Sequence, residues 1–146
     1  MSHLIIKFEL SDNPYTTSQE KGVTVRNGYV RFYEKDEVAK MRQEYTQRIR
    51  RFIRVNNLDV PDFKDTLKLK VIFCFRIQER RKWGCLKATK PDCDNAVKLL
   101  QDVLAEELGF QDQQIAELQV AKFWAEKPTV CIEIEEVACD LYRIKR

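Results

Sequence analysis

The sequence predicts an α+β protein in which a mixed β-sheet packs as a single layer against two main helices. Two long segments place apolar residues at the spacings of three and four that are typical of helices, while several shorter segments alternate apolar with polar residues as strands do. The 146 residues correspond to one domain, and a hydrophobic fraction of 44% supplies a core that needs no disulfide or structural metal. We therefore predict a single domain over residues 1–146.

The strands are predicted from period-two alternation and from the turn residues that separate the segments. Asn27 and Gly28 favour a tight turn, so we expect a small hairpin around them, at the end of a polar stretch, 11–28, that is otherwise mostly loop. The predicted strands are Leu4–Leu10, Val23–Val25, Tyr29–Phe32, Thr66–Ile77, Ile115–Trp124 and Thr129–Glu136.

The first helix is predicted over Lys35–Val55. Its apolar stripe consists of Val38, Met41, Tyr45, Ile49 and Phe52. Five arginines and only one acid lie between Arg42 and Arg54, so the opposite face is strongly basic. This face is either an ordinary solvated surface or a contact for nucleic-acid phosphates. The candidates for the second role are Arg48, Arg50, Arg51 and Arg54.

The second helix is predicted over Asp92–Leu108, with Gly109 as the residue that ends it. It follows a basic segment without periodicity, Gln78–Pro91, and a loop of this length in a compact domain is usually functional or disordered. Trp83 in this loop could either cover the edge of the core or stack at a DNA branch point, whereas Phe110 is expected in the core. The candidate phosphate contacts of the loop are Arg80, Arg81, Lys82, Lys87 and Lys90.

The composition disfavours several other classes of protein. Five cysteines, an odd number with no CxxC pair, indicate a reducing compartment, and the single histidine, His3, does not provide for a zinc site. No apolar run approaches the ~18 residues of a membrane helix. Lys7 and Glu9 interrupt the apolar stretch near the N-terminus, so no secretory signal is predicted. We expect a cytoplasmic protein that has no membrane partner.

The segment most informative about chemistry is the start of the second helix, where Asp92, Asp94 and Asn95 stand together. Residues of these types cap helices and offset the helix dipole. Asp94, Lys98 and Asp102 also have the spacing of two surface ion pairs. Alternatively, the carboxylates bind a metal ion, since capping a helix needs only one acid.

A third carboxylate, Asp112, follows the helix, and we expect it to converge with Asp92 and Asp94 on one ion. Clustered carboxylates repel one another unless a hard cation binds them, and Mg²⁺, with Mn²⁺ as a substitute, prefers such oxygen ligands. The ion would activate a water for attack on a phosphodiester, while Lys98 would stabilise the charge that develops on the phosphate. The pattern therefore predicts a metal-dependent hydrolase that acts on a polyanion.

These motifs resemble the RusA family of Holliday junction resolvases, which are often carried by bacteriophages and prophages. The resemblance covers about residues 66–136 and rests on Lys-Pro-Asp-Cys-Asp-Asn-Ala-Val-Lys at 90–98, Asp102, Gly-Phe-Gln-Asp-Gln-Gln-Ile at 109–115 and Lys122. It implies a RusA-like fold and a Mg²⁺-dependent homodimer that nicks four-way DNA junctions symmetrically in a bacterial or phage-infected cell. By motif position, the resemblance implies that Asp92, Asp94 and Asp112 are the metal-binding catalytic acids and that Lys98 is also catalytic. It further implies supporting roles for Asn95 and Asp102 and a DNA contact by Lys122.

Two departures from the family's pattern bear on activity. Gln111 stands where the family commonly has an additional acid, so only Asp112 can serve there, and residues 13–21 lack the family's Lys-x-Arg-Pro-Arg stretch. The alternative function is therefore a prophage protein that binds junction DNA through a site that has lost its catalytic activity. An enzyme of another class that acts on nucleotides is disfavoured, because the sequence has no glycine-rich phosphate loop.

Overall fold

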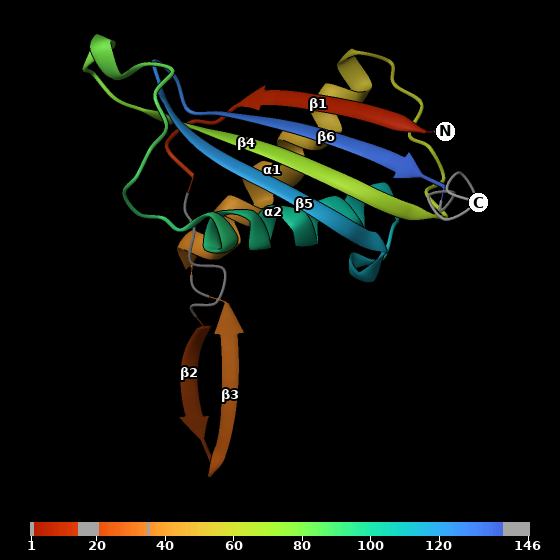
Figure 1. Ribbon diagram of the computed structural model, residues 1–146. Helices are drawn as coiled ribbons and strands as arrows, with labels where there is room; N and C mark the ends of the chain where they lie inside the picture. Colours follow the sequence, from red (N-terminus) through yellow and green to blue (C-terminus); the bar gives the residue numbers. More distant parts are fainter. Residues whose placement is uncertain (1, 15–20, 35, 139–146) are drawn as a thin grey trace, which may run out of the picture.

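The computed structural model describes residues 2–14, 21–34 and 36–138, which form an α+β arrangement as predicted (Figure 1). The elements are β1 (His3–Glu9), β2 (Lys21–Arg26), β3 (Tyr29–Glu34), α1 (Asp36–Val55), β4 (Thr66–Arg76), α2 (Cys93–Leu108), β5 (Ile115–Ala125) and β6 (Thr129–Val137). Short 3₁₀ turns lie at Arg80–Lys82 and Asp112–Gln114. Every predicted helix and strand is present, and their ends agree with the prediction to within two residues.

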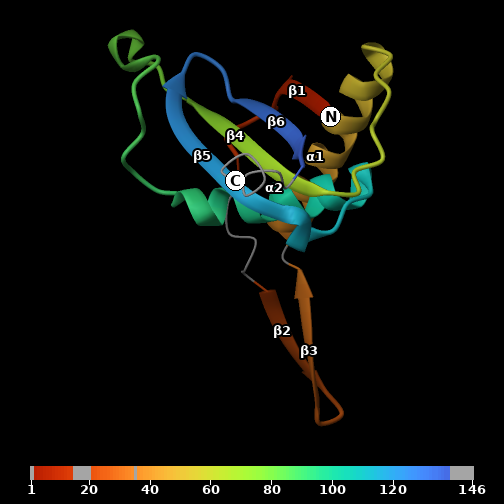
Figure 2. The same ribbon diagram turned by 45° about the vertical axis from the view of Figure 1, so that its right-hand side comes forward.

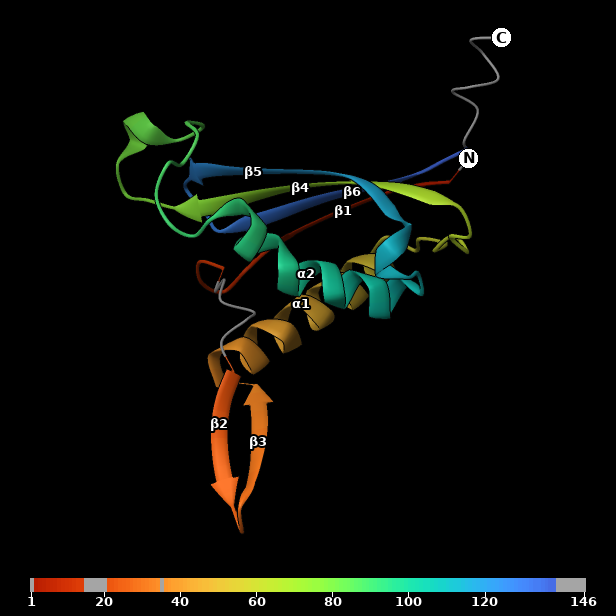
Figure 3. The same cartoon turned by 60° about the horizontal axis from the view of Figure 1, so that its bottom comes forward.

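Four strands form one mixed sheet in the order β1-β6-β4-β5, in which β4 and β5 are parallel and the other neighbours are antiparallel. Figure 3 shows both helices beneath one face of this sheet, with the opposite face uncovered. α2 is the crossover between the two parallel strands, so it runs back along the sheet before β5 begins. This places the start and the end of α2 at opposite ends of the sheet.

The core lies between the sheet and the two helices. α1 contributes the predicted stripe, in which Tyr45 and Ile49 are fully buried, and Tyr45 meets Phe8 edge to face with 6.3 Å between ring centroids. Phe52, the last member of the predicted stripe, is only partly buried. α2 ends at Gly109 as predicted, with a left-handed backbone (φ 75°) that strains any residue with a side chain. No helix in the described part of the chain is long and apolar enough to cross a membrane.

β2 and β3 form a separate two-stranded sheet that extends away from the rest of the molecule (Figures 1 and 2). Asn27 and Gly28 make its turn with φ values of 53° and 79°, the left-handed conformation that a tight hairpin turn requires. The predicted turn is confirmed, and the strands beside it are longer than predicted. Residues 15–20 of the stretch predicted as mostly loop, 11–28, lie outside the described residues.

The basic loop between β4 and α2 is folded against the edge of β5 rather than disordered. The Gly84 N–H donates to the carbonyl of Trp124 at 2.8 Å, and the Trp124 N–H donates to the carbonyl of Cys85 at 2.9 Å. The Trp83 indole N–H donates to the carbonyl of Ile77 at 2.8 Å. Trp83 therefore fastens the loop to the residue that follows β4, and its predicted roles, covering the core edge or stacking on DNA, stay predictions.

Candidate metal centre

The start of α2 carries two exposed carboxylates. Asp92 immediately precedes the helix with an extended backbone (φ −67°, ψ 149°), and Asp94 lies in the first turn. The Asp92 side chain accepts no capping hydrogen bond. The backbone carbonyl of Asp92 accepts a hydrogen bond from the Ala96 N–H at 2.9 Å. The predicted capping alternative therefore does not account for the Asp92 carboxylate.

Neither carboxylate has a hydrogen-bond or ion-pair partner among the described residues. Lys98 lies one turn after Asp94 and is exposed, yet the two side chains form no ion pair within the described ranges. The backbone N–H groups at a helix start favour negative charge, so the fold tolerates both acids there. A cation from outside the chain is the partner that this arrangement can accept.

Asp112 lies at the other end of α2, in the 3₁₀ turn that follows Gly109 and Phe110. A helix of 16 residues is about 24 Å long, so the Asp112 carboxylate is far from Asp92 and Asp94 of the same chain. Within the described ranges, no three His, Cys, Asp or Glu side chains are grouped so as to hold a metal ion. The expected convergence within one chain is wrong, because the crossover between parallel strands carries the chain to the far end of the sheet before Asp112.

Asp112 is nevertheless held in a defined position. Its neighbours Gln111 and Gln114 form a capping box, in which the Gln114 side-chain oxygen accepts the Gln111 N–H at 2.8 Å. Gln114 Nε2 donates to the carbonyls of Phe63 and Asp65 at 3.2 and 3.0 Å, which ties the turn to the segment before β4. This role of Gln114 was not predicted, although the Gln-x-x-Gln spacing is that of a capping box. Phe110 is buried in the core as predicted.

The two residues predicted to support the metal site, Asn95 and Asp102, lie at different parts of α2 in the structure. Asp102 lines a cavity of about 420 Å³ together with Glu106 and Asp112, so it lies toward the second end of α2. Asn95 adjoins Asp94 in the chain and is partly buried. Of the two, only Asn95 remains at the start of the helix.

Two lysines predicted to contact DNA are directed into the protein. Lys87 is 7% exposed, and its ammonium donates to the carbonyl and hydroxyl oxygens of Thr89 at 3.0 and 2.8 Å. Burial lowers the pKa of Lys87, and the neighbouring Lys122 ammonium lowers it further. Lys122 Nζ donates to the carbonyls of Thr89 and Pro91 at 2.7 and 2.5 Å. The prediction of Lys87 as a phosphate contact is wrong, because its charge is buried and bound to the loop.

Comparison with known proteins identifies the family. A model of the family described as endodeoxyribonuclease RusA matches residues 12–135. The chain is 33% identical to the crossover junction endodeoxyribonuclease rusA of Lactococcus phage r1t, over 90% of this chain and 96% of that relative. This chain belongs to the RusA family of Holliday junction endodeoxyribonucleases. The predicted family is therefore confirmed, and RusA-family nucleases are generally metal-dependent.

A second relative of this RusA-family protein is the uncharacterized protein YqaN of Bacillus subtilis. The two chains are 40% identical over 62 residues, which are 42% of this chain and 44% of that relative. The relatives thus include one protein from a phage and one from a bacterium.

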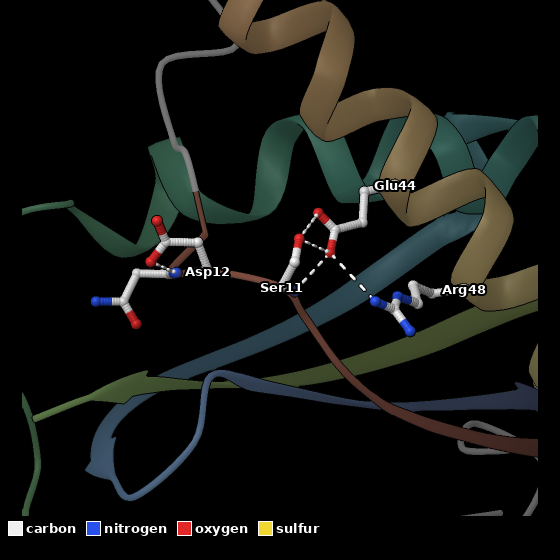
Figure 4. Close-up of polar contacts among 5 residues, drawn as sticks. Ser11, Asp12, Glu44 and Arg48 are labelled. Carbon is white, nitrogen blue, oxygen red and sulfur yellow. Dashed lines mark hydrogen bonds and ion pairs between the residues drawn. The ribbon is translucent and has the colours of Figure 1, made fainter.

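On α1 of the RusA-family protein, the basic residues divide into paired and unpaired ones. Arg48 lies 3.7 Å from Glu44, which also accepts the N–H and the hydroxyl of Ser11, each at 2.7 Å (Figure 4). These contacts join the end of β1 to α1. Arg51 and Arg54, in contrast, are exposed and have no partner in the part of the chain that the structure describes.

Arg50, which precedes Arg51 on α1, is paired with an acid of α2. It donates two hydrogen bonds to Glu107 of α2, at 2.8 and 2.9 Å, and these bonds raise the pKa of Arg50, with the negative charge of Glu107 adding to the effect. The predicted alternative of an ordinary structural surface therefore holds for Arg48 and Arg50. Arg51 and Arg54 fit both predicted alternatives, a solvated surface and a contact for phosphates.

Apart from the buried Lys87, the loop before α2 places its basic residues at or near the surface. The Arg80 guanidinium lies 5.7 Å from the centre of the Trp83 ring system. Arg81 and Lys82 approach the same acid, Glu79, at 3.3 and 3.8 Å, and both pairs are largely solvated. Lys90 is exposed and, among the described residues, unpaired.

Proposed function

We propose that this RusA-family protein is a Mg²⁺-dependent endonuclease that resolves four-way DNA junctions by paired, symmetric nicks. The observation that carries the proposal is the pair of exposed carboxylates at the start of α2, which have no partner among the described residues. Membership of the family and the name of the phage relative support the choice of a branched DNA substrate. The predicted cytoplasmic location in a bacterial or phage-infected cell is part of this proposal.

The donor set at the start of α2 fits a hard divalent cation. Proteins usually bind Mg²⁺ through one or two carboxylates, while water and substrate phosphates complete its octahedral shell. Asp92 and Asp94 supply these two carboxylates, and Mn²⁺ is the natural substitute. When bound, such an ion polarises a phosphodiester oxygen and activates a water nucleophile.

We further propose that a second copy of the chain supplies the third carboxylate. Asp112 is exposed and lies at the opposite end of the helix that begins at Asp92. A two-fold axis near the middle of α2 would run the two copies of this helix antiparallel, and Asp112 of the partner subunit would then lie beside Asp92 and Asp94. The same symmetry would create two equivalent sites, which is what two nicks in a two-fold symmetric junction require.

Lys98 is placed to act on the phosphate. It lies on the same helical face as Asp94, one turn further along, and is exposed and unpaired within the described residues. Its ammonium can therefore approach the substrate and stabilise the charge that develops on the phosphoryl oxygens. The flanking phosphate contacts that we propose are Arg51, Arg54, Arg80, Arg81, Lys82 and Lys90.

A nicking assay on a synthetic four-way junction tests the proposal, with a linear duplex of the same sequence as the substrate control. We expect wild-type protein to nick the junction in Mg²⁺ or Mn²⁺ and not in EDTA. Asp94→Asn should lose on the order of 10³-fold in cleavage rate and retain junction binding, because it removes a metal ligand only. The matched control is Asp62→Asn, at an exposed acid that pairs with Lys64, and it should cut like wild type.

Equal cutting by Asp94→Asn and wild type would overturn the assignment of the metal centre. Junction binding by wild-type protein without any cleavage, in Mg²⁺ and in Mn²⁺, would instead establish the alternative, a DNA-binding protein without catalytic activity.

A further inference from the structure

Lys87 is the only charged side chain that is buried among the described residues. Removing an ammonium from water is costly unless it is paired or fully hydrogen-bonded. No acid lies within ion-pair distance of it in the described ranges. Its burial therefore requires another explanation, and the surroundings of the ammonium provide one.

The Lys87 ammonium is held by two ring faces and three oxygens. Its Nζ lies 4.9 Å from the ring centre of Phe75 and 4.7 Å from that of Trp124, within the range of cation–π attraction. It donates to the carbonyl and hydroxyl oxygens of Thr89 and to the carbonyl of Lys90. An ammonium has three donors, and all of these acceptors belong to the two loop residues 89 and 90.

Lys122 on β5 extends this arrangement toward the metal centre. The Lys87 N–H donates to the Lys122 carbonyl at 2.9 Å, beside an isolated β-bridge between Leu86 and Phe123, so the loop residue lies next to Lys122 of β5. Lys122 Nζ donates to the carbonyls of Thr89 and Pro91. Two ammoniums thus fix three consecutive carbonyls, at residues 89, 90 and 91, and the next residue is Asp92.

Packing alone does not explain a charge at position 87. An apolar side chain of similar length would fill the space between the two aromatic rings without the cost of desolvation. Only an ammonium supplies both the cation–π attraction to the two rings and the hydrogen bonds to the loop carbonyls. These bonds fix the backbone from which the Asp92 carboxylate projects.

We propose that Lys87 is a positioning residue for the metal-binding carboxylate Asp92, acting through the loop carbonyls that it and Lys122 bind. The inference rests on the proposed function, since it assumes that Asp92 is a metal ligand. It assigns to Lys87 no contact with DNA or with the metal ion. Residues that orient metal ligands typically change metal affinity by 10–100-fold when they are removed.

The test compares Lys87→Met with Lys64→Met, which makes the same change at an exposed lysine outside the loop. Mn²⁺ binding is measured by electron paramagnetic resonance, junction binding by gel shift, and the fold by thermal unfolding. We expect Lys87→Met to bind Mn²⁺ about tenfold or more weakly and to need correspondingly more Mg²⁺ for half-maximal nicking, with junction binding retained. Lys64→Met should match wild type in all of these measurements.

Wild-type Mn²⁺ affinity in folded Lys87→Met would overturn this inference and leave the proposed function intact. Failure of the wild-type protein itself to bind Mn²⁺ would overturn the proposed function, and the inference with it. If Lys87→Met does not fold, Lys122→Met decides, because Lys122 is only partly buried and its ammonium binds the same loop. We expect it to lose several-fold in Mn²⁺ affinity, and an unchanged affinity would overturn the inference.

Discussion

The two ends of α2 differ in what their carboxylates contact. Near its end, Glu107 accepts two hydrogen bonds from Arg50, at 2.8 and 2.9 Å. At its start, Asp92 and Asp94 have no partner among the described residues, although Lys98 is only one turn away. Glu107 is thus paired by the chain itself, whereas we assign the two carboxylates at the start of α2 to a ligand from outside the chain.

The same division exists among the arginines of α1. Arg50 is bound to Glu107, while its neighbour Arg51 and the nearby Arg54 extend into solvent without a partner in the described part of the chain. The paired charges connect elements: Arg50 binds α1 to α2, and Glu44 binds α1 to the end of β1. We assign the unpartnered Asp92 and Asp94 to metal and the unpartnered Arg51 and Arg54 to DNA, and the variants below test these assignments.

Among the basic residues, the largest effect on activity is expected from replacing the unpaired Lys98, and this variant tests whether unpaired charges are functional. Lys98→Met should lower the cleavage rate by on the order of 10²–10³-fold, because the developing phosphate charge loses its stabilising cation. The melting temperature should stay close to wild type, since the ammonium has no partner in the folded chain as described. Junction binding and Mn²⁺ affinity should change far less than the rate, since we assign Lys98 to the charge that develops in the transition state. Nicking assays under single-turnover conditions measure the effect, and a rate within threefold of wild type would contradict the role.

A smaller effect is expected from the unpaired arginines of α1. Replacing Arg51 and Arg54 together by Gln should reduce the slope of log affinity against log salt by about two, because each phosphate contact contributes about 0.9. The matched control is Arg50→Gln, whose charge is already bound to Glu107 and whose slope should stay unchanged. Fluorescence anisotropy with a labelled junction at several salt concentrations gives both slopes. Identical slopes for the two variants would remove the distinction between paired and unpaired arginines.

The smallest expected effect concerns a paired acid, Glu136. Backbone N–H groups of Asp65 and Lys64 donate to its carboxylate and lower the pKa of Glu136 below its ordinary value of 4.5. A lowered pKa means that the carboxylate stabilises the fold above about pH 4.5 and that this stabilisation is lost as the pH falls through the folded-state pKa. Glu136→Gln should therefore melt below wild type at pH 7, with a difference that shrinks at pH 3. A difference that is the same at both pH values would show that the charge contributes nothing.

Local pattern was sufficient to predict the elements of the fold and the acids at the start of α2. Asp92 and Asp94 are two residues apart at a helix start, so no long-range packing is needed to place them together. The position of Asp112 depends on the length and direction of the crossover helix, which its own motif does not encode. The burial of Lys87 depends on Phe75 of β4 and Trp124 of β5, which its own segment does not reveal, so a lysine in a basic run was predicted as exposed.

The central claim, a metal centre shared between two copies of the chain, is tested most directly by mixing two inactive variants. Asp94→Asn and Asp112→Asn are co-expressed with different tags, and the mixed dimer is purified and assayed on the four-way junction. In a shared arrangement, one site of the mixed dimer carries both substitutions and the other carries none. We predict that each variant alone is inactive and that the mixed dimer nicks one strand of the junction per dimer. A mixed dimer as inactive as its parents, beside an active wild type, would contradict the shared site.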